Sequence, residues 1–327
     1  MKWMGVGLLA AFVLAAPVLA QPAKVPLPPE QPASAPAAPA AQPTSADVDL
    51  AYGAYERGFY LTAFNEATKR AAQNDAAAMT LLGELYAQGL GVGQDDKKAA
   101  QWYKLGAEHG DPNAMFSLAM FNIAQRGGLS SRADAVKLLE EATKLGHILA
   151  AYDLGLLYLQ GRDVPQDFGR AAALFTDAAQ AGSPEAQYAL ATMYKEGRGV
   201  EKDEQKAASL LAKASIGGNI DAMVEFAIAQ FNGIGTAKNE AASAQLFLKA
   251  AQRGSPIAQD RLSRILMAGR GMPANPTGAV KWHIIAKAAG ASDPDLDVYA
   301  AKQPQAVRDA AEKAAQKWMS TLKQPRS

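Results

Sequence analysis

The chain has 327 residues, and its 33 lysines and arginines nearly balance its 32 acidic residues. Because no segment forms a basic stripe, the composition argues against binding to nucleic acid or to an anionic membrane surface. The absence of cysteine excludes disulfide bonds, which a chain with a large apolar core does not require.

Residues 1–20 have the pattern of a secretory signal peptide. Lys2 gives a short cationic start, residues 3–16 are apolar, and residues 18–20 (Val-Leu-Ala) form a small-residue cleavage site. The alternative is an uncleaved membrane anchor, but the apolar run is shorter than the ~20 residues that a span needs. We therefore expect cleavage after Ala20 and a soluble mature protein in the periplasm.

Residues 21–46 are rich in proline and alanine and hold eight of the 18 prolines in the chain. Such segments are extended and bury too little apolar surface to fold. We predict a disordered linker here. A proline-rich ligand for a partner is the less favoured interpretation.

Residues 47–77 resemble a shortened opening repeat. Leu50, Ala51, Ala54 and Tyr55 are predicted to lie on one helix, Gly58 marks a tight turn, and a partner helix is predicted from Phe59 to Gln73.

Residues 78–293 contain six repeats of 36 residues, in which two kinds of helix boundary recur. A glycine, which readily adopts the left-handed conformation that ends a helix, closes each second helix. These glycines are Gly110, Gly146, Gly182, Gly218, Gly254 and Gly290. The residues that precede the second helices are of N-capping types: Asp95, Ser131, Asp167, Asp203, Asn239 and Asn275. This periodicity predicts an all-α solenoid of stacked helix-turn-helix repeats.

Residues 294–327 lose this register. Within them, Gln305 to Leu322 has the pattern of a single charged amphipathic helix. A solenoid needs a polar-faced terminus to remain soluble, so we expect this helix to cap the open end of the stack.

The repeat motif resembles that of the Sel1-like repeat family, which is related to tetratricopeptide repeats. The clearest copy runs from Ala78 to Gly110 and contains Leu82-Gly83, Tyr86, Gly89-Leu90-Gly91-Val92, Asp95, Lys98-Ala99, Trp102-Tyr103 and Ala107. The resemblance covers about residues 47–293. Two turns depart from it, because Gln125 and Asp163 replace turn glycines, and these turns are expected to differ in shape. The resemblance implies a right-handed superhelix whose first helices line a concave face. It also implies a protein-binding role, since members act as adaptors that include regulators of bacterial envelope signalling.

The predicted partner-binding face follows from the leucines at positions 82, 118, 154 and 190, which are expected to point into the core. Residues two positions before or after them then point away from the core stripe. The polar residues Thr80, Glu84, Asp260 and Arg264 stand at the ends of this face, and apolar residues stand in the middle. The predicted binding residues are Phe116, Met120, Ile123, Tyr152, Leu156, Leu159, Tyr188, Val224, Ile228 and Phe231. A contiguous exposed apolar band usually marks a binding site, unless curvature or the C-terminal helix covers it.

No combination of residues predicts a nucleophile with a base, a cofactor or a metal site. The three histidines, His109, His147 and His283, lie in different repeats, and surface or helix-end positions are expected for them. The leading hypothesis is a periplasmic, non-enzymatic adaptor that binds a polypeptide, such as the sensor domain of a histidine kinase or an envelope assembly factor.

Two alternatives to the adaptor remain. The first is a cell-wall-associated enzyme or enzyme cofactor that uses Glu84, Glu196 or Asp260, although these carboxylates do not recur as a pair. The second is a purely structural spacer.

Overall fold

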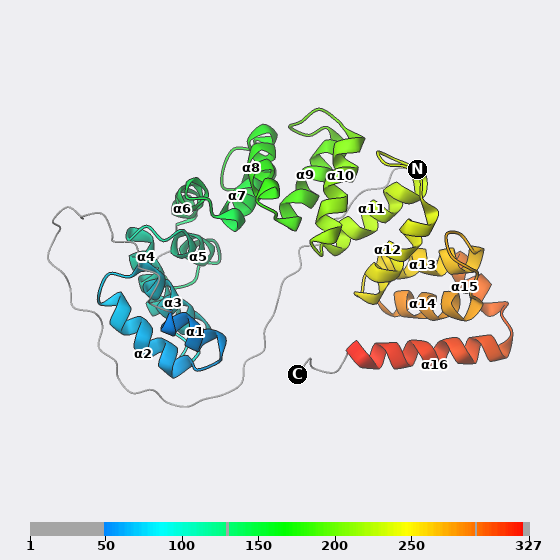
Figure 1. The fold of residues 1–327 in the computed structure, drawn as a ribbon, viewed down its shortest axis with the longest axis horizontal. Helices are drawn as coiled ribbons and strands as arrows, with labels where there is room; N and C mark the ends of the chain where they lie inside the picture. Colours follow the sequence, from blue (N-terminus) through cyan, green and yellow to red (C-terminus); the bar gives the residue numbers. More distant parts are fainter. Residues whose placement is uncertain (1–48, 129–130, 292, 323–327) are drawn as a thin grey trace. The chain divides into compact units, whose positions relative to one another are not determined.

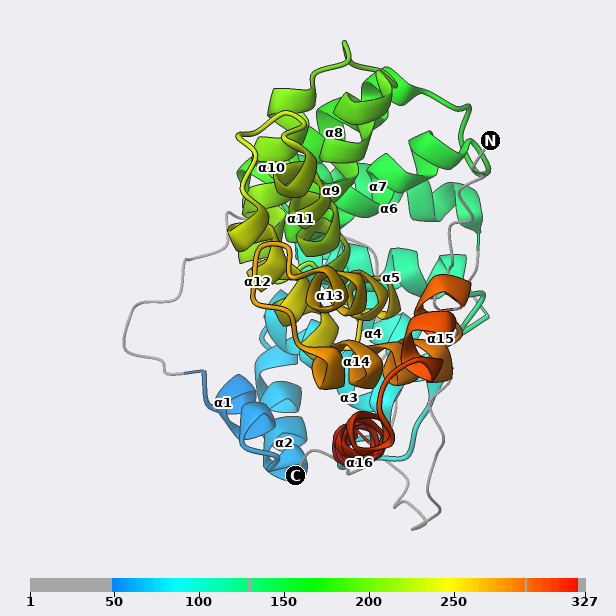
Figure 2. The ribbon, with the colours of Figure 1, turned by 90° about the vertical axis from the view of Figure 1, so that its right-hand side faces the viewer.

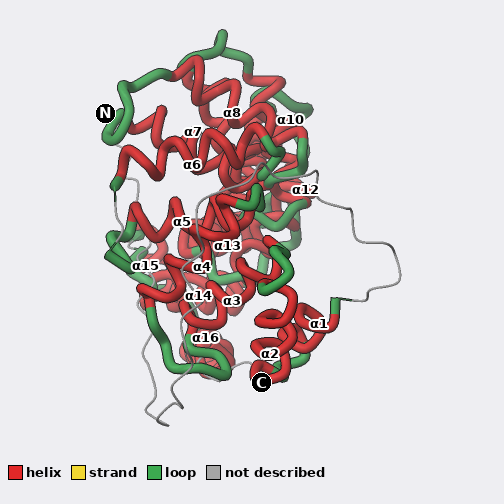
Figure 3. The backbone as a smooth tube through the Cα atoms, turned by 90° about the vertical axis from the view of Figure 1, so that its left-hand side faces the viewer, coloured by secondary structure: helices red, strands yellow, loops and turns green. Residues whose placement is uncertain are grey.

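The computed structural model describes residues 49–128, 131–291 and 293–322, and every regular element in these ranges is an α-helix (Figures 1 and 3). None of the helices in these ranges is long and apolar enough to cross a membrane. The predicted signal peptide and linker, residues 1–46, lie outside the described residues.

The described helices follow one another with short turns between them. In chain order they are α1 (Leu50–Glu56), α2 (Tyr60–Ala71), α3 (Ala76–Gln88), α4 (Asp96–Glu108), α5 (Pro112–Ile123), α6 (Arg132–Lys144), α7 (Ile148–Gln160), α8 (Phe168–Gln180), α9 (Pro184–Glu196), α10 (Glu204–Ile216), α11 (Ile220–Asn232), α12 (Glu240–Gln252), α13 (Pro256–Ala268), α14 (Pro276–Ala288), α15 (Pro294–Ala301) and α16 (Gln305–Leu322). The prediction of an all-α fold built from helix-turn-helix repeats is confirmed. We call the odd-numbered helices from α3 to α13 first helices and the even-numbered helices from α4 to α14 second helices.

The described residues form two compact units: residues 49–114 with 124–128, and residues 115–123 with 131–291 and 293–322. In the first unit, α1 packs on α2, α2 on α3, and α3 on α4. Ala51, Ala54, Ala63 and Ala67 are buried where α1 and α2 meet, because alanine side chains let two helices approach closely. The predicted opening helix pair is therefore present.

The second unit repeats one packing scheme from α6 to α14, in which each helix contacts the next helix along the chain. Its core contains one large side chain from each successive second helix, among them Leu139, Phe175, Leu211 and Phe247, all at most 2% exposed. These side chains recur every 36 residues, so each repeat contributes the same layer to the core.

The predicted N-caps of the second helices are confirmed at all six positions. In each case the side chain accepts a hydrogen bond from a backbone amide in the first helical turn, as Asp203 does from Lys206 at 2.9 Å. The glycines that follow the second helices all have positive φ, for example 95° at Gly218. The N-capping side chains thus bind backbone amides that a helix leaves without a partner at its start.

The turn between the helices of a repeat also joins neighbouring repeats. Gly199 has φ of 67°, and a Cβ atom at this position would overlap the Phe168 carbonyl at the start of α8, in the preceding repeat. Gly235 and Gly271 approach α10 and α12 in the same way. A side chain does not fit where the two backbones touch.

The two turns that depart from the repeat pattern behave differently from each other. Gln125 retains the left-handed conformation that glycine has in other repeats, with φ of 56°. Asp163 does not adopt positive φ, and its carboxylate instead accepts a hydrogen bond from Arg132 at 3.2 Å. The expected difference in shape is therefore found at Asp163.

The C-terminal part contains one helix more than predicted. The predicted helix at residues 305–322 is present as α16, which packs on α14 (Figure 2). The ring of Trp318 stands edge-on to the ring of Trp282, with the ring centroids 5.5 Å apart. The short helix α15 precedes α16, and Asp293 caps its start. Arg264 on α13 donates to the same Asp293 at 2.6 Å, so this residue ties α15 to the last repeat.

Candidate functional site

The ten predicted binding residues lie on four first helices, α5, α7, α9 and α11, and all belong to the second unit. Nine of them are partly exposed, whereas Val224 is 4% exposed and belongs to a core cluster. The nine partly exposed residues form what we call the first-helix face: Phe116, Met120, Ile123, Tyr152, Leu156, Leu159, Tyr188, Ile228 and Phe231.

The aromatic residues of this face are held by ring contacts. The Phe116 ring stacks on the ring of His147, with centroids 4.6 Å apart and an interplanar angle of 25°. Tyr152 contacts the buried Phe175 at 5.7 Å. These rings are therefore ordered before any partner arrives, which lowers the entropy that binding would lose.

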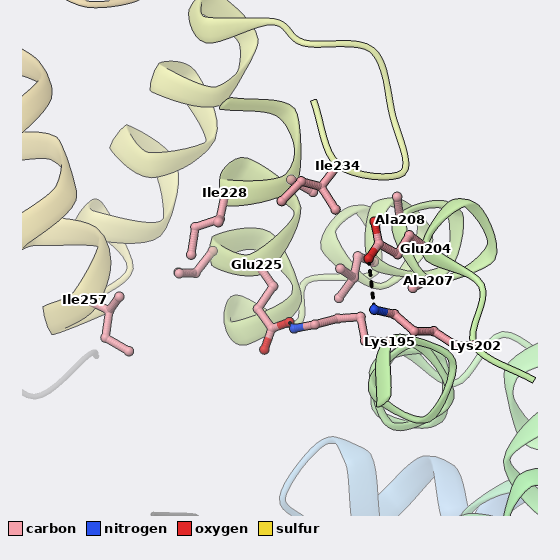
Figure 4. A pocket seen from close by; sticks show the side chains of 12 residues that line it. Lys195, Lys202, Glu204, Ala207, Ala208, Glu225, Ile228, Ile234 and Ile257 are labelled. Atoms are coloured by element: carbon pink, nitrogen blue, oxygen red, sulfur yellow. Dashed lines mark hydrogen bonds and ion pairs between the residues drawn. The ribbon is translucent and has the colours of Figure 1, made fainter. Parts of the chain in front are cut away.

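Two cavities border Ile228 of this face, and residues from α9 to α13 line them. The first has a volume of about 530 Å³ (Figure 4). Its lining consists of Lys195, Lys202, Glu204, Ala207, Ala208, Leu211, Val224, Glu225, Ile228, Ala229, Ile234 and Ile257. Val224, although buried, thus belongs to the wall of this cavity.

Charged side chains in the first cavity are paired. The Glu225 carboxylate accepts hydrogen bonds from Lys195 Nζ at 2.5 Å and from the Tyr188 hydroxyl at 3.0 Å. Lys202 pairs with Glu204 at 3.2 Å, and Figure 4 shows both ion pairs. Burial and the adjacent Glu225 raise the pKa of Tyr188 well above its usual range, so its hydroxyl stays a neutral donor.

The second cavity has a volume of about 370 Å³ and shares Ile228 with the first. It is lined by Ile228, Phe231, Asn232, Phe247, Arg261, Arg264, Ile265, Met267, Ala268 and Arg270. The Arg270 guanidinium lies 4.3 Å from the centre of the Phe231 ring and donates to Glu240 at 3.2 Å. Because both cavities border Ile228, we treat them together as one groove.

The charged residues of this region were not part of the predicted site. Glu225 and Arg261 stand directly before the position of the periodic leucine, and Asp153 holds the same position in an earlier repeat. Burial raises the pKa of the Asp153 carboxyl to about 6. The 36-residue spacing of this position was a signal that could have identified them.

The carboxylates considered for catalysis are already engaged with other side chains. Glu84 accepts a hydrogen bond from the Tyr103 hydroxyl at 2.7 Å, Glu196 pairs with Arg198 at 2.9 Å, and Asp260 lies 4.0 Å from Arg264. The described residues contain no group of three or more histidine, aspartate or glutamate side chains placed to hold a metal ion.

The histidines serve structural purposes. His147 caps α7, where its Nδ1 accepts a hydrogen bond from the Ala150 amide at 3.0 Å, and His109 stands at the end of α4. The expected helix-end position is confirmed for these two. It is wrong for His283, which is buried and contacts Asp297 through Nε2 at 2.8 Å, because α15 covers this part of α14.

The model of the Sel1 repeat matches six consecutive segments, at residues 76–111, 112–147, 148–183, 184–219, 220–255 and 256–290. Among solved structures, the chain is similar to c5321, a protective antigen of uropathogenic Escherichia coli that displays an SLR fold. The identity is 22%, the TM-score is 0.72, and the match covers 85% of this chain and 63% of that one. A Sel1 repeat protein from Oxalobacter formigenes is 26% identical with a TM-score of 0.64, over 76% of this chain and 100% of that one.

The match thus spans less than two thirds of the E. coli antigen structure. The comparison with curated proteins gave no match.

Proposed function

We propose that this chain, which belongs to the Sel1 repeat family, is an exported, non-enzymatic scaffold that binds a polypeptide along its first-helix face. Sel1 repeat proteins are generally scaffolds for protein–protein interaction. The observation that carries the proposal for this chain is the groove, in which two cavities of consecutive repeats share Ile228.

The groove suits a polypeptide more than a small molecule. Its lining comes from five consecutive helices, α9 to α13, and consists mainly of apolar side chains. A chain with several apolar side chains could place one in each cavity, and ordered aromatic side chains on the same face commonly supply much of the binding energy at protein interfaces.

The arrangement of carboxylates favours binding over catalysis. A general acid and base must both reach the same reacting atoms, usually within hydrogen-bond distance. Glu84 instead accepts a hydrogen bond from the Tyr103 hydroxyl at 2.7 Å, Glu196 pairs with Arg198, and Asp260 lies beside Arg264. None of the three carboxylates named in the competing hypothesis, a cell-wall-associated enzyme or enzyme cofactor, therefore pairs with another of the three.

The proposed location is the periplasm, on the basis of the signal-peptide pattern at residues 1–20. The partner would then be a periplasmic polypeptide. We propose the sensor domain of a histidine kinase or an envelope assembly factor, in keeping with a regulatory role in envelope signalling.

Site-specific photo-crosslinking in intact cells tests this proposal. A benzophenone amino acid replaces Tyr152 or Ile228 on the first-helix face, and Gln245, exposed on the second helix α12, serves as the matched control. We expect one defined polypeptide to cross-link from both face positions and not from Gln245, and to bind the purified chain. Cross-links confined to Gln245, or none from either face position, would contradict the proposal.

A further inference from the structure

We propose that the groove binds acidic apolar polypeptide segments, with an aspartate or glutamate of the partner paired to Arg261. This inference rests on the proposed function and specifies the chemistry of the partner. It follows from the difference in charge between the two cavities.

The first cavity carries no uncompensated charge. It is lined by two lysines and two glutamates, and these form two ion pairs within the lining, Lys195 with Glu225 at 2.5 Å and Lys202 with Glu204 at 3.2 Å. A charged partner side chain would have to break one of these pairs to bind. This cavity therefore favours an apolar side chain of the partner, which would pack on Ile228 and Val224.

The second cavity has the opposite balance. Three arginines line it, and its lining includes no acidic residue. Two of the arginines have partners elsewhere: Arg264 donates to Asp293 at 2.6 Å, and Arg270 donates to Glu240 at 3.2 Å.

Arg261 is the arginine whose guanidinium is left for a partner. It is exposed, and within the described ranges it makes no hydrogen bond or ion pair. Its charge favours the ionised form of Asp260, but burial and the neighbouring Asp293 carboxylate outweigh it and raise the pKa of Asp260.

The two cavities together define the occupant. An arginine guanidinium pairs with a carboxylate through two parallel hydrogen bonds, which adds direction to the contact. Ile228, Phe231 and Met267 provide apolar surface beside Arg261. A segment that carries apolar side chains next to a carboxylate satisfies both features, whereas a basic segment would place its charge against the unpaired guanidinium of Arg261.

The test uses the full mature chain, immobilised, and a phage-displayed library of random dodecapeptides as the probe. Selected peptides are synthesised with a fluorescent label, and their Kd values are measured by anisotropy. We expect selection of peptides in which aspartate or glutamate adjoins apolar residues. Arg261→Glu should weaken their binding by about tenfold or more, since losing a charged pair and adding repulsion changes the affinity by at least that factor.

Matched variants separate the site from general effects. Arg162→Glu makes the same change of charge at an exposed residue in the turn after α7, outside both cavities, and should leave Kd within about twofold. Ile228→Ser should also weaken binding, whereas Ile216→Ser, at a side chain 86% exposed and outside the groove, should not. Since Ile228 packs partly on the core, the surface variant Arg261→Glu remains the deciding one.

Each other outcome overturns the inference. The inference is wrong if the selected peptides are neutral or basic, or if no peptide is selected at all. It is also wrong if Arg162→Glu weakens peptide binding as much as Arg261→Glu does, or if Arg261→Glu leaves binding unchanged. If cross-linking still captures a partner from the first-helix face, the proposed function stands and only the chemistry assigned to the groove is wrong.

Discussion

The contact between turns and preceding repeats can be tested with two glycines of the same turn. Gly197 and Gly199 have nearly equal φ, 69° and 67°, so alanine suffers similar backbone strain at both, about 1–2 kcal/mol. Their surroundings differ. A Cβ at Gly197 would lie 3.4 Å from the Cβ of Lys202, an ordinary contact, whereas a Cβ at Gly199 would overlap the Phe168 carbonyl and lie 2.9 Å from the Gly169 nitrogen.

Overpacking typically adds about 1–3 kcal/mol to the cost of a substitution. We therefore expect Gly197→Ala to lower the free energy of unfolding by about 1–2 kcal/mol and Gly199→Ala by roughly 2–5 kcal/mol. Urea unfolding followed by circular dichroism measures the difference in free energy of unfolding. Equal losses for the two variants would refute the claim that this turn packs against the preceding repeat.

Three further predictions address other parts of the chain. Because burial raises the pKa of Asp153 from its ordinary value near 4 to about 6, stability falls as the pH rises from about 4 to about 6 and stays lower above that range. Asp153→Asn should therefore raise stability by about 1–3 kcal/mol at pH 7.5 and change it little near pH 4, as measured by urea unfolding at both pH values. Trp318→Ala should loosen α16 from α14 and lower the free energy of unfolding by about 2–4 kcal/mol in thermal unfolding. Lys313→Ala, at an exposed position of the same helix, should change it by less than about 0.5 kcal/mol. The mature protein should begin at Gln21, and mass spectrometry that finds residues 1–20 intact on the exported protein would contradict cleavage.

The repeats could be predicted because their boundaries depend on local chemistry. A capping side chain such as Asp203 and a positive-φ glycine such as Gly218 act within a few residues of the chain, so a period of 36 residues displays them directly. The helix α15 could not be found in the same way. It has eight residues and buries only Leu296, so it has no apolar period, and its one local signal is the pair Asp293-Pro294.

The candidate site was predictable only in part. Helical spacing identified which side of the first helices turns away from the core leucines, and nine of the ten residues are partly exposed. The burial of Val224 and the pairing of Glu225 with Lys195 depend on a neighbouring repeat about one period away. Such contacts follow from how repeats stack, and a single-chain pattern does not contain that geometry.

Hydrogen–deuterium exchange of the chain with its cross-linked partner tests the central claim most directly. First and second helices alternate along the sequence, so peptic peptides can separate them within each 36-residue repeat. Binding along the first-helix face predicts that the partner slows exchange in α7, α9, α11 and α13, and in the part of α10 that lines the first cavity, and leaves α8 unchanged. Protection confined to the second helices, or to α16 alone, would contradict it.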